Sequence, residues 1–291
     1  MAIAPARPLR ILCAALLAAC ACTRADDAPF ASNADAERTI RDLLVASPYK
    51  ISERARAGTI RYTLEHARVA WNWPETGEQH VETRGDRTTL TICGDCGRET
   101  APSTEELARY LAPNAWVDSD DRALRSFARA AGGHSVESRM SALVLAVRMH
   151  MNGAIDFRHY ASASEALASR EGDCTEFAVL LAAAARARGI PARVVAGLGY
   201  DGHFLGRSHV FVPHMWVQVW NGERWRSHDA ALERFDAGHI ALAVGDGRPE
   251  EMHGVMAMIG KLRIVDAAGV PPARDGAGSG ESEVRDSPAA R

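Results

Sequence analysis

An α+β fold is predicted for this chain, because the spacing of its apolar residues changes from strand-like to helical and back again. Residues 58–93 alternate between apolar and polar positions, which is typical of half-buried antiparallel strands. Residues 103–151 carry apolar residues at helical spacing, and strand-like segments return between 192 and 229. With 291 residues, of which 47% are hydrophobic and 24% charged, the chain can bury a sizeable core.

The first 22 residues are predicted to be a signal peptide. Arg7 and Arg10 precede an apolar run over residues 11–19, which is too short to span a bilayer but suits a secretory signal. Residues 17–20 (LAAC) resemble a bacterial lipobox, in which Cys20 would be lipidated and anchor the protein to the outer membrane. Plain cleavage shortly after Cys20 is the alternative. Both outcomes predict an exported, periplasmic protein.

Residues 30–100 are predicted to form an N-terminal β-rich region, with turn-like segments at 73–77 and 84–86. Near its end, Cys93 and Cys96 are expected to close a short-loop disulfide, since export brings them to an oxidising compartment. A zinc half-site is disfavoured because no second CxxC or HxxxH accompanies the pair. A redox role would require a thioredoxin-like pattern, which is absent from the sequence.

Residues 101–270 are predicted to form the main domain, beginning with helices over 103–111, 120–131 and 136–151. Asp173 and Glu176 have the spacing of a capping box and start a further helix, which Gly189 and Pro191 end. Strands are expected at 192–200 and 209–229, followed by a short helical stretch over 235–244. Residues 271–291 are rich in Gly, Pro, Ser and charge and are predicted to be a disordered tail.

Cys174 falls in the first turn of the helix that Asp173 caps. Unpaired N–H groups and the positive end of the helix dipole favour a thiolate there, which is the form of cysteine that attacks carbonyls. The structural alternative is a small buried apolar residue beside an alanine-rich helix.

The segments 214–220 and 223–229 flank Asn221-Gly222, the preferred pair for a two-residue type I′ turn. This turn would place His214 directly opposite Asp229, with Cβ atoms about 5 Å apart on one face. The carboxylate could then accept the imidazole N–H and fix the tautomer of the ring. A surface ion pair that contributes little is the plainer interpretation of the same pattern.

Four segments resemble, in order and spacing, the transglutaminase-like superfamily of papain-like thiol enzymes: 170–178 (REGDCTEFA), 189–195 (GIPARVV), 214–219 (HMWVQV) and 225–229 (WRSHD). The resemblance implies a nucleophile helix packed on an antiparallel sheet, with Cys174 as nucleophile, His214 as base and Asp229 as the orienting group. It implies a thiol acyl transferase or hydrolase that acts on peptide or glutamine-type amides through a thioester. The alternative is a non-catalytic envelope protein that uses the same fold for binding.

Several classes of partner and cofactor are not expected. A net charge of -3 offers no basic excess for nucleic acid, so the expected partner is a peptide or protein substrate. No cofactor or metal is expected, because neither an HExxH pattern nor a calcium-binding DxDxDG run occurs. For the same reason, the histidines near the predicted site are not expected to bind a metal: His203, His209, His228 and His239.

The oxyanion hole is only partly predicted. The backbone N–H of Cys174 is expected to supply one donor, whereas Trp116 is too distant in sequence to be assigned as the other. Trp216 shares the predicted face of His214 and is expected to line the cleft, while Trp220 and Trp225 are expected to pack the hairpin.

Overall fold

The computed structural model describes residues 33–66, 71–153 and 160–270; the predicted signal peptide, Cys20 and the predicted tail lie outside them. No helix within these ranges has the length and apolarity to cross a membrane. The helices are α1 (Asn33–Asp42), α2 (Glu53–Arg56), α3 (Thr104–Arg109), α4 (Arg122–Ala130), α5 (Val136–His150), α6 (Ala163–Ser169), α7 (Cys174–Ala187) and α8 (Pro249–Ile259). The strands are β1 (Val45–Ala46), β2 (Thr59–His66), β3 (Gln79–Arg84), β4 (Arg87–Ile92), β5 (Asn152–Gly153), β6 (Glu171–Gly172), β7 (Ala192–Phe204), β8 (Arg207–Trp220), β9 (Trp225–His228), β10 (His239–Gly245) and β11 (Leu262–Val270).

A five-stranded antiparallel sheet forms the centre of the molecule, in the order β1-β8-β7-β10. The fifth strand, β9, pairs with the C-terminal half of β8. It lies on the same edge of β8 as β1, which pairs with the N-terminal half. The long hairpin of β7 and β8 is apolar along most of its length, which suits a sheet covered on both faces. This sheet carries His214 on β8.

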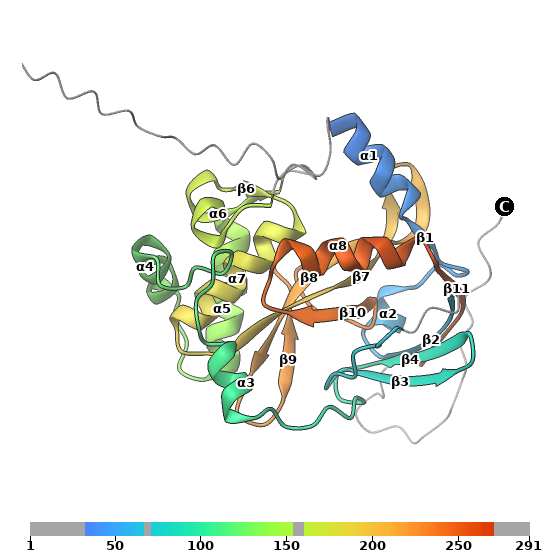
Figure 1. Ribbon diagram of the computed structural model, residues 1–291, viewed down its shortest axis with the longest axis horizontal. Helices are drawn as coiled ribbons and strands as arrows, with labels where there is room; N and C mark the ends of the chain where they lie inside the picture. The colour runs from blue at the N-terminus through green and yellow to red at the C-terminus, as the bar shows by residue number, and fades with distance from the viewer. Residues whose placement is uncertain (1–32, 67–70, 154–159, 271–291) are drawn as a thin grey trace, which may run out of the picture.

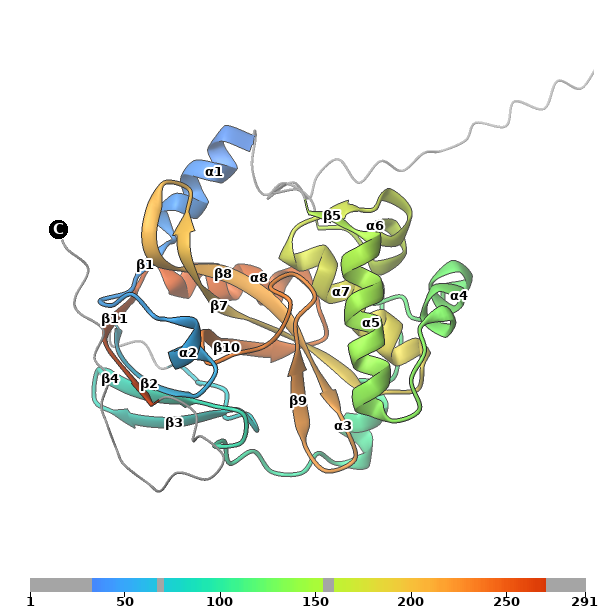
Figure 2. The same cartoon turned by 180° about the vertical axis from the view of Figure 1, so that it is seen from behind.

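Helix α7 packs against β7 and β8 and is buried along almost its whole length. Its residues 182–185 are four alanines, which allow close approach of the sheet and of α4, α5 and α6. Figures 1 and 2 show these helices gathered at one end of the molecule, around α7. The predicted α+β fold, with the cysteine-bearing helix on an antiparallel sheet, is therefore confirmed.

The predicted N-terminal β element is a second sheet, in the order β11-β2-β4-β3 (Figure 1). Gly85 and Asp86 make the tight turn between β3 and β4, where Gly85 has φ +68°. The edge strand β11 comes from the opposite end of the chain, so this sheet joins both ends of the described structure. The helix predicted over 235–244 is wrong: His239–Gly245 form β10, whose run of small and β-branched residues pairs with β7.

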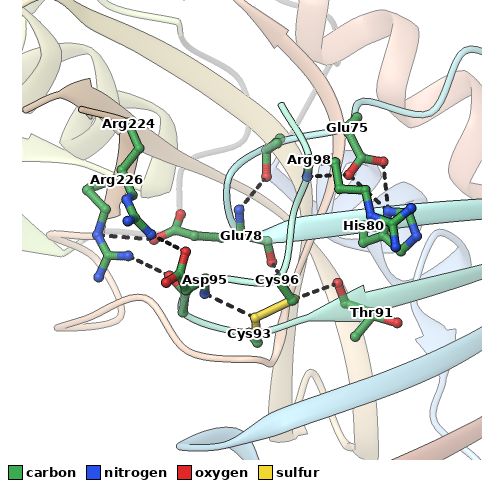
Figure 3. Close-up of a disulfide and its surroundings, with 12 residues drawn as sticks. Glu75, Glu78, His80, Thr91, Cys93, Asp95, Cys96, Arg98, Arg224 and Arg226 are labelled. Carbon is green, nitrogen blue, oxygen red and sulfur yellow. Dashed lines mark hydrogen bonds and ion pairs between the residues drawn. A yellow bond between two sulfur atoms is a disulfide. The ribbon is translucent and has the colours of Figure 1, made fainter. Parts of the chain in front are cut away.

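The two sheets are tied together by side chains rather than by shared strands. The Gln79 side chain donates to Ala241 O at 3.0 Å and accepts from Ala241 N at 2.9 Å, as a paired strand would. Cys93 and Cys96 form the predicted disulfide, with Cα atoms 5.7 Å apart. Arginines from the β9 hairpin reach the loop that the disulfide closes (Figure 3): Arg224 pairs with Asp95, and Arg226 donates to Gly94 O.

Candidate active site

The start of α7 is built as the sequence predicts. Asp173 is the N-cap, and its Oδ1 accepts from Thr175 N at 2.9 Å. Glu176 completes the capping box by accepting from Asp173 N at 3.0 Å, and its second oxygen accepts from Ala161 N at 3.0 Å. The two carboxyl groups are therefore helix caps, and Cys174 is the first residue of the helix.

The surroundings of Cys174 do not favour a free thiolate, contrary to the expectation from its helix position alone. Cys174 as a residue is half-buried, but its thiol is enclosed by protein atoms. Burial raises the pKa of the thiol well above its ordinary value, and the Asp173 carboxylate raises it further. The backbone N–H of Met215, the residue after His214, acts in the opposite direction. The thiol therefore lies beside β8 and needs a proton acceptor to ionise.

His214 and Asp229 are joined by a hydrogen bond, although the predicted hairpin register is wrong. The loop between β8 and β9 has four residues, 221–224, so that Trp220 pairs with Trp225 and Gln218 with Ser227. Asn221 Oδ1 accepts from two backbone N–H groups of this loop, which explains why the chain does not turn in two residues. The shift of two positions keeps each side chain on its predicted face.

Extending the observed register puts Asp229 opposite Trp216, which makes His214 its diagonal neighbour. His214 Nε2 lies 2.6 Å from Asp229 Oδ2, and the two side chains are 3% and 1% exposed. Because Nε2 is the nitrogen that donates to the carboxylate, Nδ1 is left as the ring's proton-accepting nitrogen.

Asp229 is held by four donors. Its Oδ1 accepts from the backbone N–H groups of Ala231 and Leu232, at 2.7 and 2.9 Å. Its Oδ2 lies 3.0 Å from His239 Nε2 in addition to the His214 contact. Burial alone would raise the pKa of Asp229, but His214 and His239 outweigh it and hold that pKa well below its usual range. Asp229 is therefore a carboxylate at any working pH.

Aromatic rings pack around this pair. The Trp216 ring is stacked on His214 with centroids 6.0 Å apart, which confirms that the two share a face. Trp216 Nε1 donates to Ser227 Oγ at 3.2 Å, so the ring is fixed to β9. The Trp116 ring lies edge-on to Tyr160 at 5.1 Å. Burial, and then nearby acidic groups that include Glu176 and the Cys174 thiol, raise the pKa of Tyr160 well above its usual value.

A family model described as the transglutaminase-like superfamily matches residues 125–230. A protein-glutamine gamma-glutamyltransferase of Pseudomonas aeruginosa is 39% identical over 89 residues, which are 27% of this chain and only 13% of that relative. Residues 125–230 belong to the transglutaminase-like superfamily.

Two solved structures are also similar to this chain. The periplasmic domain of TgpA from Pseudomonas aeruginosa aligns with 21% identity and a TM-score of 0.43, over 64% of this chain and 75% of that one. Red sea bream transglutaminase aligns with 10% identity and a TM-score of 0.36, over 66% of this chain and 48% of that one.

The transglutaminase-like segment contains Cys174, His214 and Asp229, and its match ends one residue after Asp229. The structure joins His214 to Asp229 by a hydrogen bond. Among the described side-chain hydrogen bonds, none links the Cys174 thiol to the His214 ring. His239 lies beyond the matched segment. Its contact with Asp229 was not predicted, because the sequence does not reveal that β10 brings its first residue beside this carboxylate.

His214, Asp229 and His239 also form the group of described residues that could hold a metal ion, with ligand atoms within 4.8 Å of one another. The distances favour hydrogen bonds instead. Ligands about 2.0–2.1 Å from a tetrahedral zinc are separated by roughly 3.4 Å, whereas His214 Nε2 and Asp229 Oδ2 are 2.6 Å apart. Both histidine contacts are accounted for by N–H groups that donate to one carboxylate oxygen.

A cavity of about 600 Å³ lies beside Asp229, between the end of α2, the disulfide loop and the segment 226–237. Its wall includes Asp229 but neither Cys174 nor His214. The charged residues in the wall include Arg56, Glu78, Arg226, Glu233 and Asp236.

Proposed function

We propose that this protein is a thiol acyl transferase or hydrolase that uses Cys174, His214 and Asp229 on peptide or glutamine-type amides. The observation that carries the proposal is the buried hydrogen bond between His214 Nε2 and Asp229 Oδ2, at 2.6 Å. This bond leaves Nδ1 as the acceptor on a ring whose neighbouring residue, Met215, contacts the thiol through its N–H. The match to the transglutaminase-like superfamily over residues 125–230 supports the same roles.

His214 is the proton acceptor that the buried thiol requires. In the first half-reaction the Cys174 proton moves to His214 Nδ1, and the sulfur attacks the amide carbonyl carbon. The backbone N–H of Cys174, at the free end of α7, is proposed as one donor to the resulting oxyanion. The C–N bond then breaks, His214 returns its proton to the leaving amine, and a thioester remains on the sulfur.

The second half-reaction decides between hydrolysis and transfer. A water molecule or a primary amine attacks the thioester carbonyl, gives a proton to His214, and releases the sulfur. Asp229, fixed by four donors, holds the ring in the tautomer that both halves need and stabilises the imidazolium formed between them.

The proposal is tested with the purified chain and glutamine-containing peptides, with and without a labelled primary amine. We expect release of ammonia or cleaved peptide, label incorporation if the amine competes with water, and a mass increase on the Cys174 peptide from the thioester. Cys174→Ala should abolish all of these signals. His228→Gln changes a histidine of the same hairpin that is not bonded to Asp229 and serves as the matched control.

A second measurement needs no substrate. Iodoacetamide labelling of Cys174, followed by peptide mass spectrometry, should be substantial at neutral pH in the wild type because His214 accepts the thiol proton. In His214→Gln this acceptor is lost, while burial and the Asp173 carboxylate still raise the pKa of the thiol, so labelling should move to a pH above that of an ordinary cysteine, about 8.5. If both proteins label like an ordinary thiol, Cys174 and His214 do not act together, and a binding protein on the same fold is the better account.

We also propose that the protein is exported to the bacterial envelope and anchored through Cys20. The arginine-led apolar run and the LAAC sequence at 17–20 support this location, as does the Cys93–Cys96 disulfide, because such bonds persist in oxidising compartments.

A further inference from the structure

A row of charged side chains continues from Asp229 away from His214. His239 Nε2 lies 3.0 Å from Asp229 Oδ2, the same oxygen that His214 contacts. On its other side the His239 ring faces Asp236, whose Oδ2 accepts from Arg56 at 2.7 Å. Cationic and anionic groups therefore alternate from the site to α2, in a region where His239 and Asp229 are almost completely buried.

Both ring nitrogens of His239 face oxygen acceptors. Nε2 faces Asp229, and Nδ1 lies 3.1 Å from the Asp236 carbonyl oxygen and 3.4 Å from Asp236 Oδ1. The Asp236 amide nitrogen is 3.3 Å from the same Nδ1, so this atom meets one donor and two acceptors. A buried ring between two carboxylates is stabilised as an imidazolium, which donates on both sides and offsets their charge.

The remaining neighbours of His239 carry no further charge. The rings of Phe235 and Trp216 lie 5.0 and 5.2 Å from its ring, and that of His214 lies 5.6 Å away. Tyr62 on β2 donates its hydroxyl to Ala237 O; burial, and then Asp236, raise its pKa well above the usual value, so it stays neutral. Among the described residues, the charged or titratable groups around His239 are thus Asp229, Asp236, His214, the neutral Tyr62 and, beyond Asp236, Arg56.

We propose that His239 is a positioning residue of this site, which shares Asp229 Oδ2 with His214, fixes the carboxylate and offsets its negative charge. This inference rests on the proposed function. Without the imidazolium the site carries one more net negative charge, so the Cys174 thiol holds its proton to higher pH. His239 itself neither touches the reacting atoms nor transfers a proton.

The charges around His239 support its cationic form. Burial by itself would lower the pKa of His239, but the hydrogen bonds to Asp229 and Asp236 outweigh it and raise the pKa to about 9. The ring therefore remains an imidazolium across the neutral range.

The first test measures how Cys174 alkylation by iodoacetamide depends on pH in His239→Gln, with the Cys174 peptide quantified by mass spectrometry. Glutamine can still donate to Asp229 but carries no charge. We expect the labelling profile to move to higher pH by about one unit, which is roughly tenfold slower labelling on its rising limb. A lower rate with an unmoved profile would mean a purely structural role and would overturn the proposal.

A second variant guards against a folding defect in the first. Asp236→Asn removes a carboxylate that keeps His239 protonated. At a pH where the ring then loses its charge, the profile should move in the same direction but less far, while Asp236→Asn with His239→Gln should move it no further than His239→Gln alone. Shifts that add would show that Asp236 does not act through His239. His228→Gln is the matched control, because burial and then Arg226 lower the pKa of His228 to about 4, so it is neutral already.

Nuclear magnetic resonance of histidine-labelled protein separates failure of this inference from failure of the proposed function. The resonances that disappear in His239→Gln should report a doubly protonated ring at neutral pH. A neutral His239 ring would overturn the inference while leaving the proposed Cys174–His214 chemistry intact. Ordinary thiol labelling in both the wild type and His214→Gln would instead remove the proposed function and leave the His239 charge as a fact about the fold.

Discussion

The orientation of Asp229 is set by its immediate hydrogen-bond partners. Its two oxygens accept from two ring nitrogens and two backbone N–H groups, so the carboxylate has no freedom to rotate. The ring of His214 is held in turn by this carboxylate and by Trp216. Such a fixed pair is what proton transfer requires, because small displacements of a catalytic group reduce rates strongly.

The backbone of β7 also leaves room for the His214 ring. A Cβ added at Gly199 would lie 3.2 Å from two ring carbons of His214 and from Leu232. Gly199→Ala should therefore displace the ring and lower catalysis, or Cys174 labelling at neutral pH, by about tenfold or more, with little loss of thermal stability. Gly202→Ala on the same strand meets nothing within 4 Å and is the control. Equal effects of the two alanines would show that the ring tolerates the added methyl group.

At the scale of the elements, the start of α7 places two carboxyl groups where burial opposes their charge. Burial first, and then the Asp173 carboxylate, raise the pKa of Glu176 to about 8. An unfolded glutamate has a pKa of about 4.3. Between these values the folded protein keeps a proton that the unfolded chain loses, so this group makes stability fall as the pH rises from about 5 to 8.

Glu176→Gln should remove that part of the pH dependence. At about pH 5 the variant should be less stable by about 1 kcal/mol, because an amide accepts only one of the two N–H groups that Glu176 accepts. The difference should reverse in sign by about pH 8, because the buried charge that the wild type then acquires costs it more than the variant loses with one hydrogen bond. Thermal unfolding across this range measures the effect, and Glu165→Gln, at the same capping-box position of α6, controls for the lost cap. A constant difference at all pH values would contradict the assignment.

The hairpin of β8 and β9 brings His214 to Asp229 as predicted, although the predicted strand register is wrong. The sequence Asn-Gly predicts a two-residue turn, but the loop closes two residues later through the Asn221 side chain. A shift by one residue would have moved one partner to the opposite face, whereas a shift by two exchanged a direct neighbour for a diagonal one. The alternation of side chains between the two faces of the strands therefore predicted this contact better than the turn type did.

For the whole molecule, the junction between the N-terminal sheet and the core depends on buried charges. Arg193 on β7 is 3% exposed and forms two hydrogen bonds to Glu99, at 2.6 and 2.9 Å. Its guanidinium also lies 4.2 Å from the centre of the Trp225 ring. Glu99→Gln should lower the free energy of unfolding by about 3 kcal/mol, because it leaves a buried arginine with only the more distant carboxylate of Glu106, 3.9 Å away.

Chemical denaturation of Glu99→Gln measures that loss. Glu65→Gln is the matched control, because Glu65 pairs with an exposed arginine, Arg87, and should change stability by no more than about 0.5 kcal/mol. Similar losses in the two variants would show that the burial of Arg193 is not what matters.

Attachment of the whole protein to the membrane is predicted to depend on one residue near the N-terminus. Cys20→Ser should release the protein from membranes into the soluble periplasmic fraction, since the thiol that would carry the lipid is gone. Fractionation of expressing bacteria, with immunodetection, measures this. Continued membrane association of the variant would refute lipidation at Cys20.

The sequence by itself determined the α+β class, the capped helix that begins with Cys174, the disulfide, and the face shared by His214 and Asp229. These features depend on periodicity, capping and spacing, which act over a few residues. Only the tertiary structure decided that β10 places His239 beside Asp229 and that β11 completes the N-terminal sheet. It also decided that burial raises the pKa of the Cys174 thiol. Those outcomes depend on which distant segments meet and on how completely they exclude water, and no local pattern of residues encodes either.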